Sequence, residues 1–423
     1  MIKIPLQDDL KLPPMRRVRQ HYDLPSEVDV SIEIEQEWDH IKGELEIDAG
    51  SRVAVCVGSR GISNLSETVR HVVKKLKEAG AEPFITPAMG SHGGATAEGQ
   101  IEVLKTRGIS EQSVGAPIKA TMEVINLGEI DGIPLFIDRL AHEADGIVLI
   151  NRIKPHTEFS GPTESGLIKM LGIGLGNQIG AEHCHRAAIT HGFYEIISAV
   201  GRSLLKRLNI LFGVALVENQ EHRTVVLRIV LAKEFESIER ELMEKAREYI
   251  SKIPVNEIDL LIIDEMGKDI SGAGIDPNVV GRAICSWADA KPWPKISRIF
   301  VRDLTEATEG HATGLGMVDF TTKRLVEKID MQATAVNALA SCCPEEAKIP
   351  MSFLSDREAI AAALMTIRPY TLEDLRIVHI KNTLELRSLM VSKGCLLDLA
   401  NNHEVDIGSE SLALKFDQAG NLI

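Results

Sequence analysis

Hydrophobic positions in the first half of the chain form short continuous runs that alternate with runs of helical spacing. The run RVAVCVG, which starts at Arg52, predicts a buried strand, and the next segment predicts an amphipathic helix that ends near Ala79, just before Gly80. A second apolar run, EPFIT, follows and predicts another strand. Strand, helix and strand in this order indicate a βαβ unit, and therefore a parallel sheet.

The same alternation continues along the rest of the chain. Further helical segments are expected at residues 139–144, 187–208, 233–252, 322–340 and 356–366, and strands at residues 135–138, 146–150, 210–217, 224–231, 258–264, 297–303 and 375–380. Apolar strands that alternate with helices are typical of a largely parallel sheet covered on both faces. We therefore predict an α/β fold in which ligands bind beyond the carboxyl ends of the strands.

The length of the chain predicts two such domains. A chain of 423 residues is longer than a single core usually accommodates, and residues 251–257, with Pro254, have the composition of a linker. We expect an N-terminal α/β domain at residues 1–253, which carries the catalytic groups, and a C-terminal α/β domain at residues 254–423, which closes over the substrate. The active site is then expected in the cleft between them, with the last residues packed back on the first domain.

Composition narrows the class of protein. A net charge of −14 disfavours binding to nucleic acid, because phosphates would be repelled. The apolar stretches are too short to span a bilayer, and the N-terminal residues lack the order of a secretory signal. The six cysteines are too few and too irregularly spaced for a disulfide framework or a zinc knuckle. We therefore predict a cytoplasmic protein with neither a nucleic-acid nor a membrane partner.

Two histidines follow predicted strands, in turns of the kind where ligands bind. His92 lies between glycines in GSHGG, which leaves it exposed at a strand-to-helix junction. His156 lies in LINRIKPHTEFSG, where Pro155 forms a turn and Arg152 and Lys154 add positive charge. A histidine beside two cations suits a carboxylate substrate. The alternative interpretations are an ordinary turn histidine and a solvated basic loop.

A lysine and a pair of histidines follow in a glycine-rich stretch. Lys169 lies in GLIKMLGIGLGNQIG, where poor solvation favours the neutral amine that a nucleophile or a covalent attachment point requires. Gly172 and Gly174 permit close approach of a bulky cofactor such as a nucleotide, although the P-loop motif is absent. The spacing of His183 and His185 indicates that one of them, rather than both, binds a metal.

Together these segments resemble the nickel-dependent lactate racemase family, whose members use a nicotinate-derived nucleotide that holds nickel in a sulfur-carbon-sulfur pincer. The resemblance covers most of the chain and rests on Arg60 in VGSRG, His92 in GSHGG, His156 in KPH, Lys169, and His185. It implies that Lys169 carries the nickel-pincer nucleotide through a thioamide link and that His185 is the fourth ligand of the nickel.

The resemblance also implies how the substrate is bound and inverted. His92 and His156 would be the acid and the base, one for each enantiomer, while hydride leaves and returns to Cα. Arg60 would bind the substrate carboxylate as a bidentate donor. The segment MGKDISGAGIDPNVVGR of the second domain would add the substrate-binding residues Lys268, Asn278 and Arg282.

The chain departs from the family pattern near its turn arginine. Val57, Gly58 and Ser59 stand where the family has an acidic residue and a threonine, and Gly61 stands where it has a proline. These departures favour a 2-hydroxy acid other than lactate, such as a dicarboxylate, an aromatic acid or a sugar acid.

We therefore predict a 2-hydroxy acid racemase or epimerase that depends on the enzymes that synthesise its cofactor. The alternatives are a metal-independent lyase that forms a Schiff base at Lys169, and a non-catalytic protein that binds a nucleotide or a metal. A dehydrogenase with a diffusible nicotinamide cofactor lacks support, because no GxGxxG motif follows a predicted strand.

Overall fold

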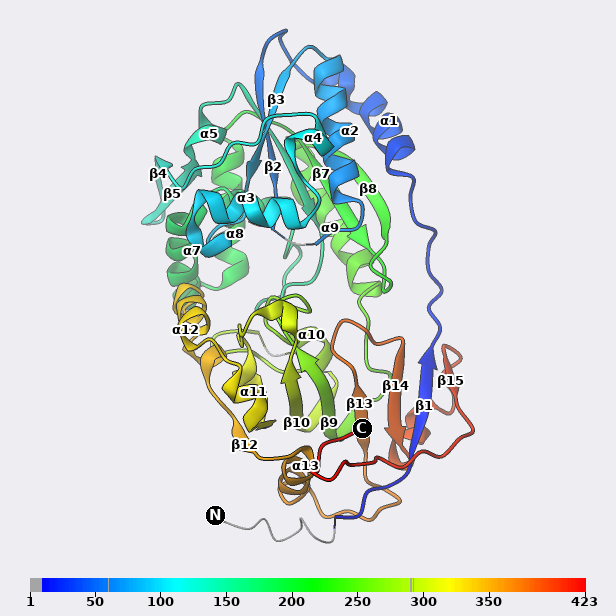
Figure 1. Ribbon diagram of the computed structural model, residues 1–423. Coiled ribbons are helices and arrows are strands. Elements are labelled where there is room, and N and C mark those ends of the chain that lie inside the picture. The colour runs from blue at the N-terminus through cyan, green and yellow to red at the C-terminus, as the bar shows by residue number, and fades with distance from the viewer. Residues whose placement is uncertain (1–9, 60, 290, 292) are drawn as a thin grey trace. The chain divides into compact units, whose positions relative to one another are not determined.

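The computed structural model describes residues 10–59, 61–289, 291 and 293–423, and this chain forms two compact units. One unit is the continuous segment Leu24–Ile250, which we call the inserted unit. The other combines Ser251–Ile423 with the N-terminal segment that ends at Asp23, and we call it the terminal unit (Figure 1). Each unit is built around a sheet of its own.

The sheet of the inserted unit is mainly parallel. Its strands lie in the order β3 (Glu82–Pro87), β2 (Arg52–Val57), β6 (Gly146–Arg152), β7 (Ile210–Glu218) and β8 (Thr224–Leu231). The first four strands run parallel, and β8 runs antiparallel to β7. The central residues of these apolar strands are buried, as a sheet covered on both faces requires.

Helices and a small hairpin complete the inserted unit. The helices are α1 (Val30–Ile41), α2 (Leu65–Glu78), α3 (Ala97–Thr106), α4 (Glu111–Val114), α5 (Arg139–His142), α6 (Leu167–Lys169), α7 (Asn177–His191), α8 (Phe193–Leu205) and α9 (Phe235–Glu248), and the hairpin strands are β4 (Val124–Ile130) and β5 (Ile133–Asp138). The predicted helix at residues 187–208 is instead the end of α7 followed by α8. The break lies at Gly192, whose φ of 86° interrupts a right-handed helix.

The sheet of the terminal unit combines a parallel and an antiparallel part. Its strands lie in the order β12 (Met351–Phe353), β11 (Phe320–Thr322), β10 (Lys295–Leu304), β9 (Glu257–Met266), β13 (Ile377–Ile380), β14 (Ser388–Ser392), β1 (Met15–Gln20) and β15 (Val405–Ile407). From β12 to β13 neighbouring strands are parallel, and from β13 to β15 they are antiparallel. The predicted α/β class with largely parallel sheets is therefore confirmed.

The terminal unit has five labelled α-helices among the described residues, of which the first four lie between the parallel strands in sequence and the last between β14 and β15. They are α10 (Pro277–Val280), α11 (Lys323–Glu327), α12 (Met331–Ala340), α13 (Asp356–Leu364) and α14 (Leu396–Leu399). The single helical stretch predicted at residues 322–340 is thus divided into α11 and α12. Asp330 accounts for the division, because its side chain accepts the N–H of Ala333 and caps a new helix.

The N-terminal strand lies in a different unit from the one predicted. The expected domain of residues 1–253 includes β1, but β1 pairs with β14 and β15 of the terminal unit (Figure 1). The expected domain of residues 254–423 begins close to the observed boundary at Ser251. Its last residues also lie in the terminal unit, where Leu412 forms a bridge to Met15.

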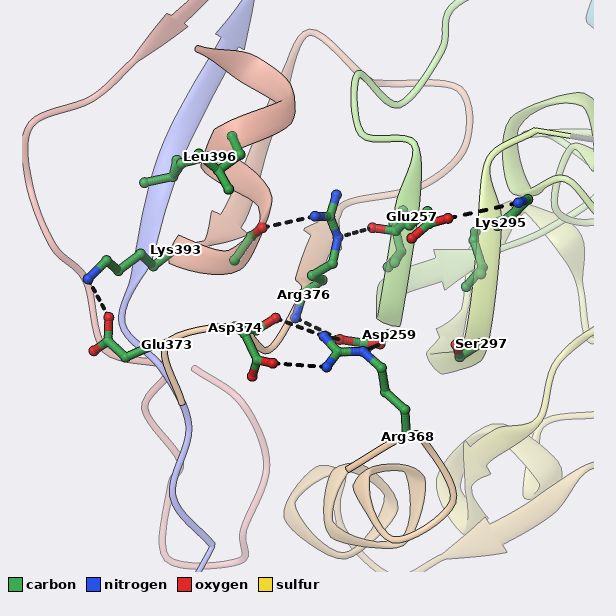
Figure 2. A pocket seen from close by; sticks show the side chains of 14 residues that line it. Glu257, Asp259, Lys295, Ser297, Arg368, Glu373, Asp374, Arg376, Lys393 and Leu396 are labelled. Atoms are coloured by element: carbon green, nitrogen blue, oxygen red, sulfur yellow. Dashed lines mark hydrogen bonds and ion pairs between the residues drawn. The ribbon is translucent and has the colours of Figure 1, made fainter. Parts of the chain in front are cut away.

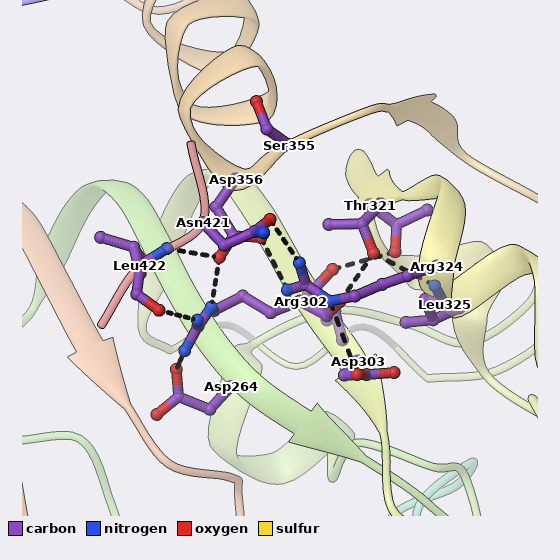
Figure 3. A network of polar contacts seen from close by, with 12 residues as sticks. Asp264, Arg302, Asp303, Thr321, Arg324, Leu325, Ser355, Asp356, Asn421 and Leu422 are labelled. Carbon is purple, nitrogen blue, oxygen red and sulfur yellow. Dashed lines mark hydrogen bonds and ion pairs between the residues drawn. The ribbon is translucent and has the colours of Figure 1, made fainter. Parts of the chain in front are cut away.

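A buried charge network holds the C-terminal residues in place (Figure 3). The fully buried carboxylate of Asp356 accepts hydrogen bonds from Arg302 Nε at 2.8 Å, Arg324 Nη2 at 2.7 Å and the backbone N–H of Leu422 at 2.9 Å. Arg302 also donates to the backbone oxygen of Leu422 and pairs with Asp264. Two guanidinium groups and a backbone donor compensate for the desolvation of the carboxylate.

Among the residues that the structure describes, no helix has both the length and the apolar character needed to cross a membrane.

Candidate functional site

The turns that follow β2, β3 and β6 lie along one edge of the inserted sheet. These strands are parallel neighbours, so their carboxyl ends face the same side. His92 follows β3 and His156 follows β6, as the sequence predicted. Arg60, the predicted carboxylate-binding residue, follows β2 but lies outside the described residues.

The loop that carries His156 is closed at its base and braced from inside. Lys154 and Ser165 exchange two backbone hydrogen bonds, of 3.1 and 3.2 Å, across the ends of the loop. The buried carboxylate of Glu164 accepts the N–H of His156 at 2.6 Å and pairs with Arg247 of α9. The closed loop brings His156 back towards α6, whose last residue is Lys169.

The side chains of His156 and Lys169 are in direct contact. Nε2 of His156 lies 2.6 Å from Nζ of Lys169, and Nδ1 of His156 accepts the backbone N–H of Glu158 at 3.1 Å. A neutral imidazole has one donor and one acceptor nitrogen, so its proton must be on Nε2 when Nδ1 accepts. The Nε2–H then donates to Lys169, whose nitrogen must offer a lone pair. The geometry therefore selects a neutral lysine amine.

Aromatic rings pack against the imidazole of His156. The His156 ring is 4.4 Å from Phe159 and 6.4 Å from Phe193, measured between ring centroids, and these two phenylalanines stack on one another at 5.4 Å. His185 of α7 contacts the same Phe193 ring at 5.4 Å. His156 and His185, which are separated in sequence, therefore contact the same Phe193 ring, and Lys169 is in contact with His156.

The two histidines of α7 point to different surroundings. His183 is exposed and packs against Phe136 of β5, with the ring centroids 5.4 Å apart, whereas His185 is half-buried against Phe193. Cys184, between them, directs its sulfur to the backbone oxygen of Gly172, and burial raises the pKa of this thiol to about 12. Of these three side chains, His185 is the one with a ring contact to Phe193, which also packs against His156.

Lys169 is followed directly by a π-helical turn at Met170–Gly174. Such turns are rare and are often found at functional sites. A Cβ at Gly174 would lie 2.7 Å from the backbone oxygen of Ala88, and a Cβ at Gly172 would lie 3.2 Å from the Val200 side chain. The two glycines thus permit close packing against neighbouring segments, and their predicted contact with a cofactor stays a prediction.

The His92 loop is attached to this same turn. The backbone N–H of Gly90 donates to the backbone oxygen of Gly174 at 3.0 Å. His92 follows two residues later, half-buried and in an extended conformation, at the start of a short 3-10 turn (Gly93–Ala95). The loops that carry the two predicted acid-base histidines are therefore both fixed to the segment around Lys169.

Arg152 has a different environment from the one expected. The sequence grouped it with Lys154 and His156 as a cation for a substrate carboxylate. In the structure Arg152 forms an ion pair with the largely buried Glu218, whose other carboxylate oxygen accepts the N–H of Ser63 at 2.6 Å. The pair neutralises Arg152 and ties the β6 end to the first βα turn.

The predicted substrate residues of the terminal unit occupy three separate environments. Lys268 follows β9 and donates to Asn337 of α12 at 2.5 Å. Asn278 lies in the first turn of α10, where its amide donates to Asp276 at 3.0 Å.

Arg282 is engaged with the backbone and with an acid of its own unit. Its guanidinium donates to the backbone oxygen of Met317 at 2.6 Å and to Asp319 at 2.7 Å, and Asp319 in turn accepts the N–H of Ile299. These contacts give Arg282 a structural role between β10 and the segment before β11. They do not support its predicted contact with substrate.

His311 was not among the predicted site residues, although it follows β10 at the same edge of the sheet as Lys268. Burial and the nearby charge of Lys268 lower the pKa of His311 to about 4, so its ring is neutral near pH 7. Its Nδ1 is 3.0 Å from the Thr313 hydroxyl. No sequence motif marks this histidine, because its proximity to Lys268 arises only through the fold.

A cavity of about 840 Å³ lies at the opposite end of the terminal sheet, where β9 and β10 begin (Figure 2). Its charged side chains form ion pairs with one another or with a neighbour. The pairs are Lys295 with Glu257, Arg368 with Asp259 and Asp374, Arg376 with Asp398, and Lys393 with Glu373. This cavity lies at the amino ends of the strands and contains none of the predicted site residues.

Comparison with known proteins gives a family match for part of the chain and a similar fold for most of it. Residues 59–233 match a family described as a domain of unknown function, DUF362, and this segment lies within the inserted unit. A comparison with curated proteins gives no match.

Two solved structures are similar to this chain. A crystal structure of a protein from Thermotoga maritima has a TM-score of 0.52 and 14% sequence identity, over 82% of this chain and 84% of that chain. The lactate racemase apoprotein from Thermoanaerobacterium thermosaccharolyticum has a TM-score of 0.46 and 14% identity, over 87% of this chain and 88% of that chain. At this identity, the likeness to the Thermotoga protein shows a common fold.

Proposed function

We propose that the protein is a racemase or epimerase that inverts the Cα centre of a small 2-hydroxy acid, with a nickel-pincer nucleotide attached to Lys169. One observation carries this proposal, the 2.6 Å contact between His156 Nε2 and Lys169 Nζ. It favours a neutral amine at Lys169, the form that a covalent attachment requires. The resemblance of the sequence segments to the nickel-dependent racemases indicates that the group attached to Lys169 is the nickel-pincer nucleotide.

The side chains around Lys169 suit such a cofactor. The pincer contains its own sulfur donors, so the protein needs to add only a single imidazole. His185 contacts the same Phe193 ring as His156, and His156 contacts Lys169. The buried rings of Phe159 and Phe193 make the surroundings of His156 apolar, which suits an aromatic cofactor ring. When bound, the nucleotide would supply the group that accepts the Cα hydride and returns it.

The residues of the chain would move the hydroxyl proton and hold the substrate. His92 and His156 each serve one enantiomer: one imidazole removes the hydroxyl proton of the substrate, and the other donates a proton to the oxygen of the inverted product, because imidazole exchanges protons near neutral pH. Arg60 binds the carboxylate. Lys268 and Asn278 contact the rest of the substrate, whereas Arg282 is left out because of its structural contacts.

Intact mass and metal content test the proposal. The chain is co-expressed with the enzymes that make the nickel-pincer nucleotide, beside Lys169→Ala and a control, Lys206→Ala, at an exposed lysine of the same unit. We expect nickel and a covalent nucleotide adduct in the wild type and the control, and neither in Lys169→Ala. An unmodified, nickel-free wild type would refute the proposal. A positive result leads to a screen of 2-hydroxy acids for loss of optical activity.

The neutral amine of Lys169 also favours a second function, a lyase that forms a Schiff base with a carbonyl substrate. Incubation with 2-oxo acids and borohydride would then trap an adduct on Lys169 in protein made without the cofactor enzymes. A protein that binds the nucleotide without catalysis would instead retain the adduct and racemise none of the acids tested.

A further inference from the structure

Glu239 of α9 lies beneath the turn that carries Lys169, although it belongs to none of the motifs described above. We infer that Glu239 is a positioning residue, whose side chain fixes the backbone of this turn and thereby holds the Lys169 amine against His156. The inference rests on the proposed function of Lys169 as a covalent attachment point.

The carboxyl of Glu239 is fitted to the start of α6. The side chain is buried, with 1% of the residue exposed, and its Oε2 accepts the backbone N–H of Ile168 at 3.2 Å. Its Oε1 occupies the space beside Gly166, where an added Cβ would lie 1.4 Å from that oxygen. Glycine at position 166 is therefore what allows the carboxyl to reach the backbone of the residue before Lys169.

The other sides of the turn are equally closely packed. An added Cβ at Gly213 would lie 2.6 Å from the Leu167 side chain, and one at Gly201 would lie 2.6 Å from the Ile168 side chain. The amide of Asn151 donates to the backbone oxygen of Gly166 at 2.8 Å. Neighbouring segments thus hold residues 166–168 from several directions, and Glu239 provides the acceptor for the N–H groups at the start of the helix.

A buried glutamate at this position requires an explanation. The first N–H groups of a helix lack acceptors within the helix, so a buried helix start needs an acceptor from elsewhere. Burial raises the pKa of Glu239 to about 8, and among the described residues Oε1 has no hydrogen-bond partner. An unpaired buried carboxyl is unfavourable in an apolar core. Its presence is explained by the hydrogen bond that it makes one residue before Lys169.

The rate at which cyanate carbamylates each lysine of the full-length chain tests the inference, because only neutral amines add to isocyanic acid. Peptide mass spectrometry compares Lys169 with the exposed Lys206 in the same sample. The variants are Glu239→Met, which removes the acceptor at similar length, and Glu239→Gln, which keeps an acceptor oxygen. Glu244→Met, at an exposed position of the same helix, is the matched control.

We expect Lys169 to react faster than Lys206 in the wild type, in Glu244→Met and in Glu239→Gln, because each retains an acceptor for the N–H groups. The Lys169 rate of Glu239→Gln should be within about twofold of the wild-type rate. In Glu239→Met the Lys169 rate should fall roughly tenfold, because a displaced amine loses its contact with His156. A purely structural role for Glu239 would lower the melting temperature of Glu239→Met and leave its Lys169 rate unchanged, which would overturn the inference.

The outcomes separate this inference from the proposed function. If wild-type Lys169 reacts no faster than Lys206, the neutral amine is refuted, and the proposed function with it. If wild-type Lys169 is fast and Glu239→Met is equally fast, only the role of Glu239 is refuted, as it also is if Glu239→Gln fails to preserve the rate. If Glu239→Met does not fold, Glu239→Asp replaces it, because its side chain is shorter by one methylene group and moves the carboxyl away from the turn. A Lys169 carbamylation rate in Glu239→Asp equal to the wild-type rate would then refute the role of Glu239.

Discussion

The buried carboxyl of Glu239 predicts a strong dependence of stability on pH. Its pKa is raised from the ordinary 4.5 to about 8 by burial, so the folded chain holds this proton more tightly than the unfolded chain does. A group whose pKa is raised on folding contributes its full stability below the unfolded pKa, and this contribution is lost as pH rises through the folded pKa. The perturbation that removes the effect is Glu239→Gln, which fills the same space without titrating.

The size of the effect follows from the two pKa values. Each tenfold difference in proton affinity is worth about 1.4 kcal/mol, so between pH 4.5 and 8 the wild type should lose about 5 kcal/mol of unfolding free energy at this site. The unfolding free energy of Glu239→Gln minus that of the wild type should therefore increase with pH by about 1.4 kcal/mol per pH unit, and level off above about pH 8.

Urea unfolding from pH 5 to 9 measures this difference. Trp38 is buried in the inserted unit and contacts Phe212, whereas Trp287 and Trp293 belong to the terminal unit. In a background of Trp287→Phe and Trp293→Phe, tryptophan fluorescence therefore reports the unit that contains Glu239. Other groups titrate equally in both proteins and cancel in the difference. A difference that is constant across this pH range would refute the reasoning.

Three further predictions concern other parts of the molecule. His156→Phe should lower the carbamylation rate of Lys169 about tenfold, because the amine loses its N–H donor while a ring of similar size remains; an unchanged rate would contradict the assigned tautomer. In cofactor-loaded protein, His185→Ala should lose nickel but keep the nucleotide mass, and His183→Ala should keep both; equal nickel loss would contradict the choice of ligand. Asp356→Asn should destabilise the terminal unit by about 3 kcal/mol in urea unfolding, because two guanidinium groups lose their buried counter-charge; a change below about 1 kcal/mol would refute this.

The strands of the inserted unit were predictable because local patterns determine them. Buried parallel strands need continuous apolar runs, and the runs from Arg52, Glu82 and Gly146 are the observed β2, β3 and β6. The break between α7 and α8 was missed because it depends on the φ of Gly192, which the spacing of apolar residues does not show. β1 was missed because its partners, Ser388–Ser392 and Val405–Ile407, lie at the other end of the sequence.

The candidate site was predictable in its residue types but not in its contacts. Glycines and apolar neighbours marked Lys169, and a strand end marked His156. Their contact depends on a closed loop and on the brace from Glu164, which no spacing predicts. Glu239 did leave a signal in the sequence, since it occupies the apolar stripe of α9 between Phe235 and Leu242, where a charged residue is unexpected.

The position of β1 has a consequence for the order in which the chain can fold. All strands of the inserted unit come from one continuous stretch, so this unit can fold as soon as that stretch has left the ribosome. The sheet that contains β1 needs β14 and β15, which are synthesised after the inserted unit. During synthesis, β1 would therefore remain unpaired while the inserted unit, which follows it in the sequence, folds. β1 is made before the inserted unit, but its partners β14 and β15 are made only after that unit.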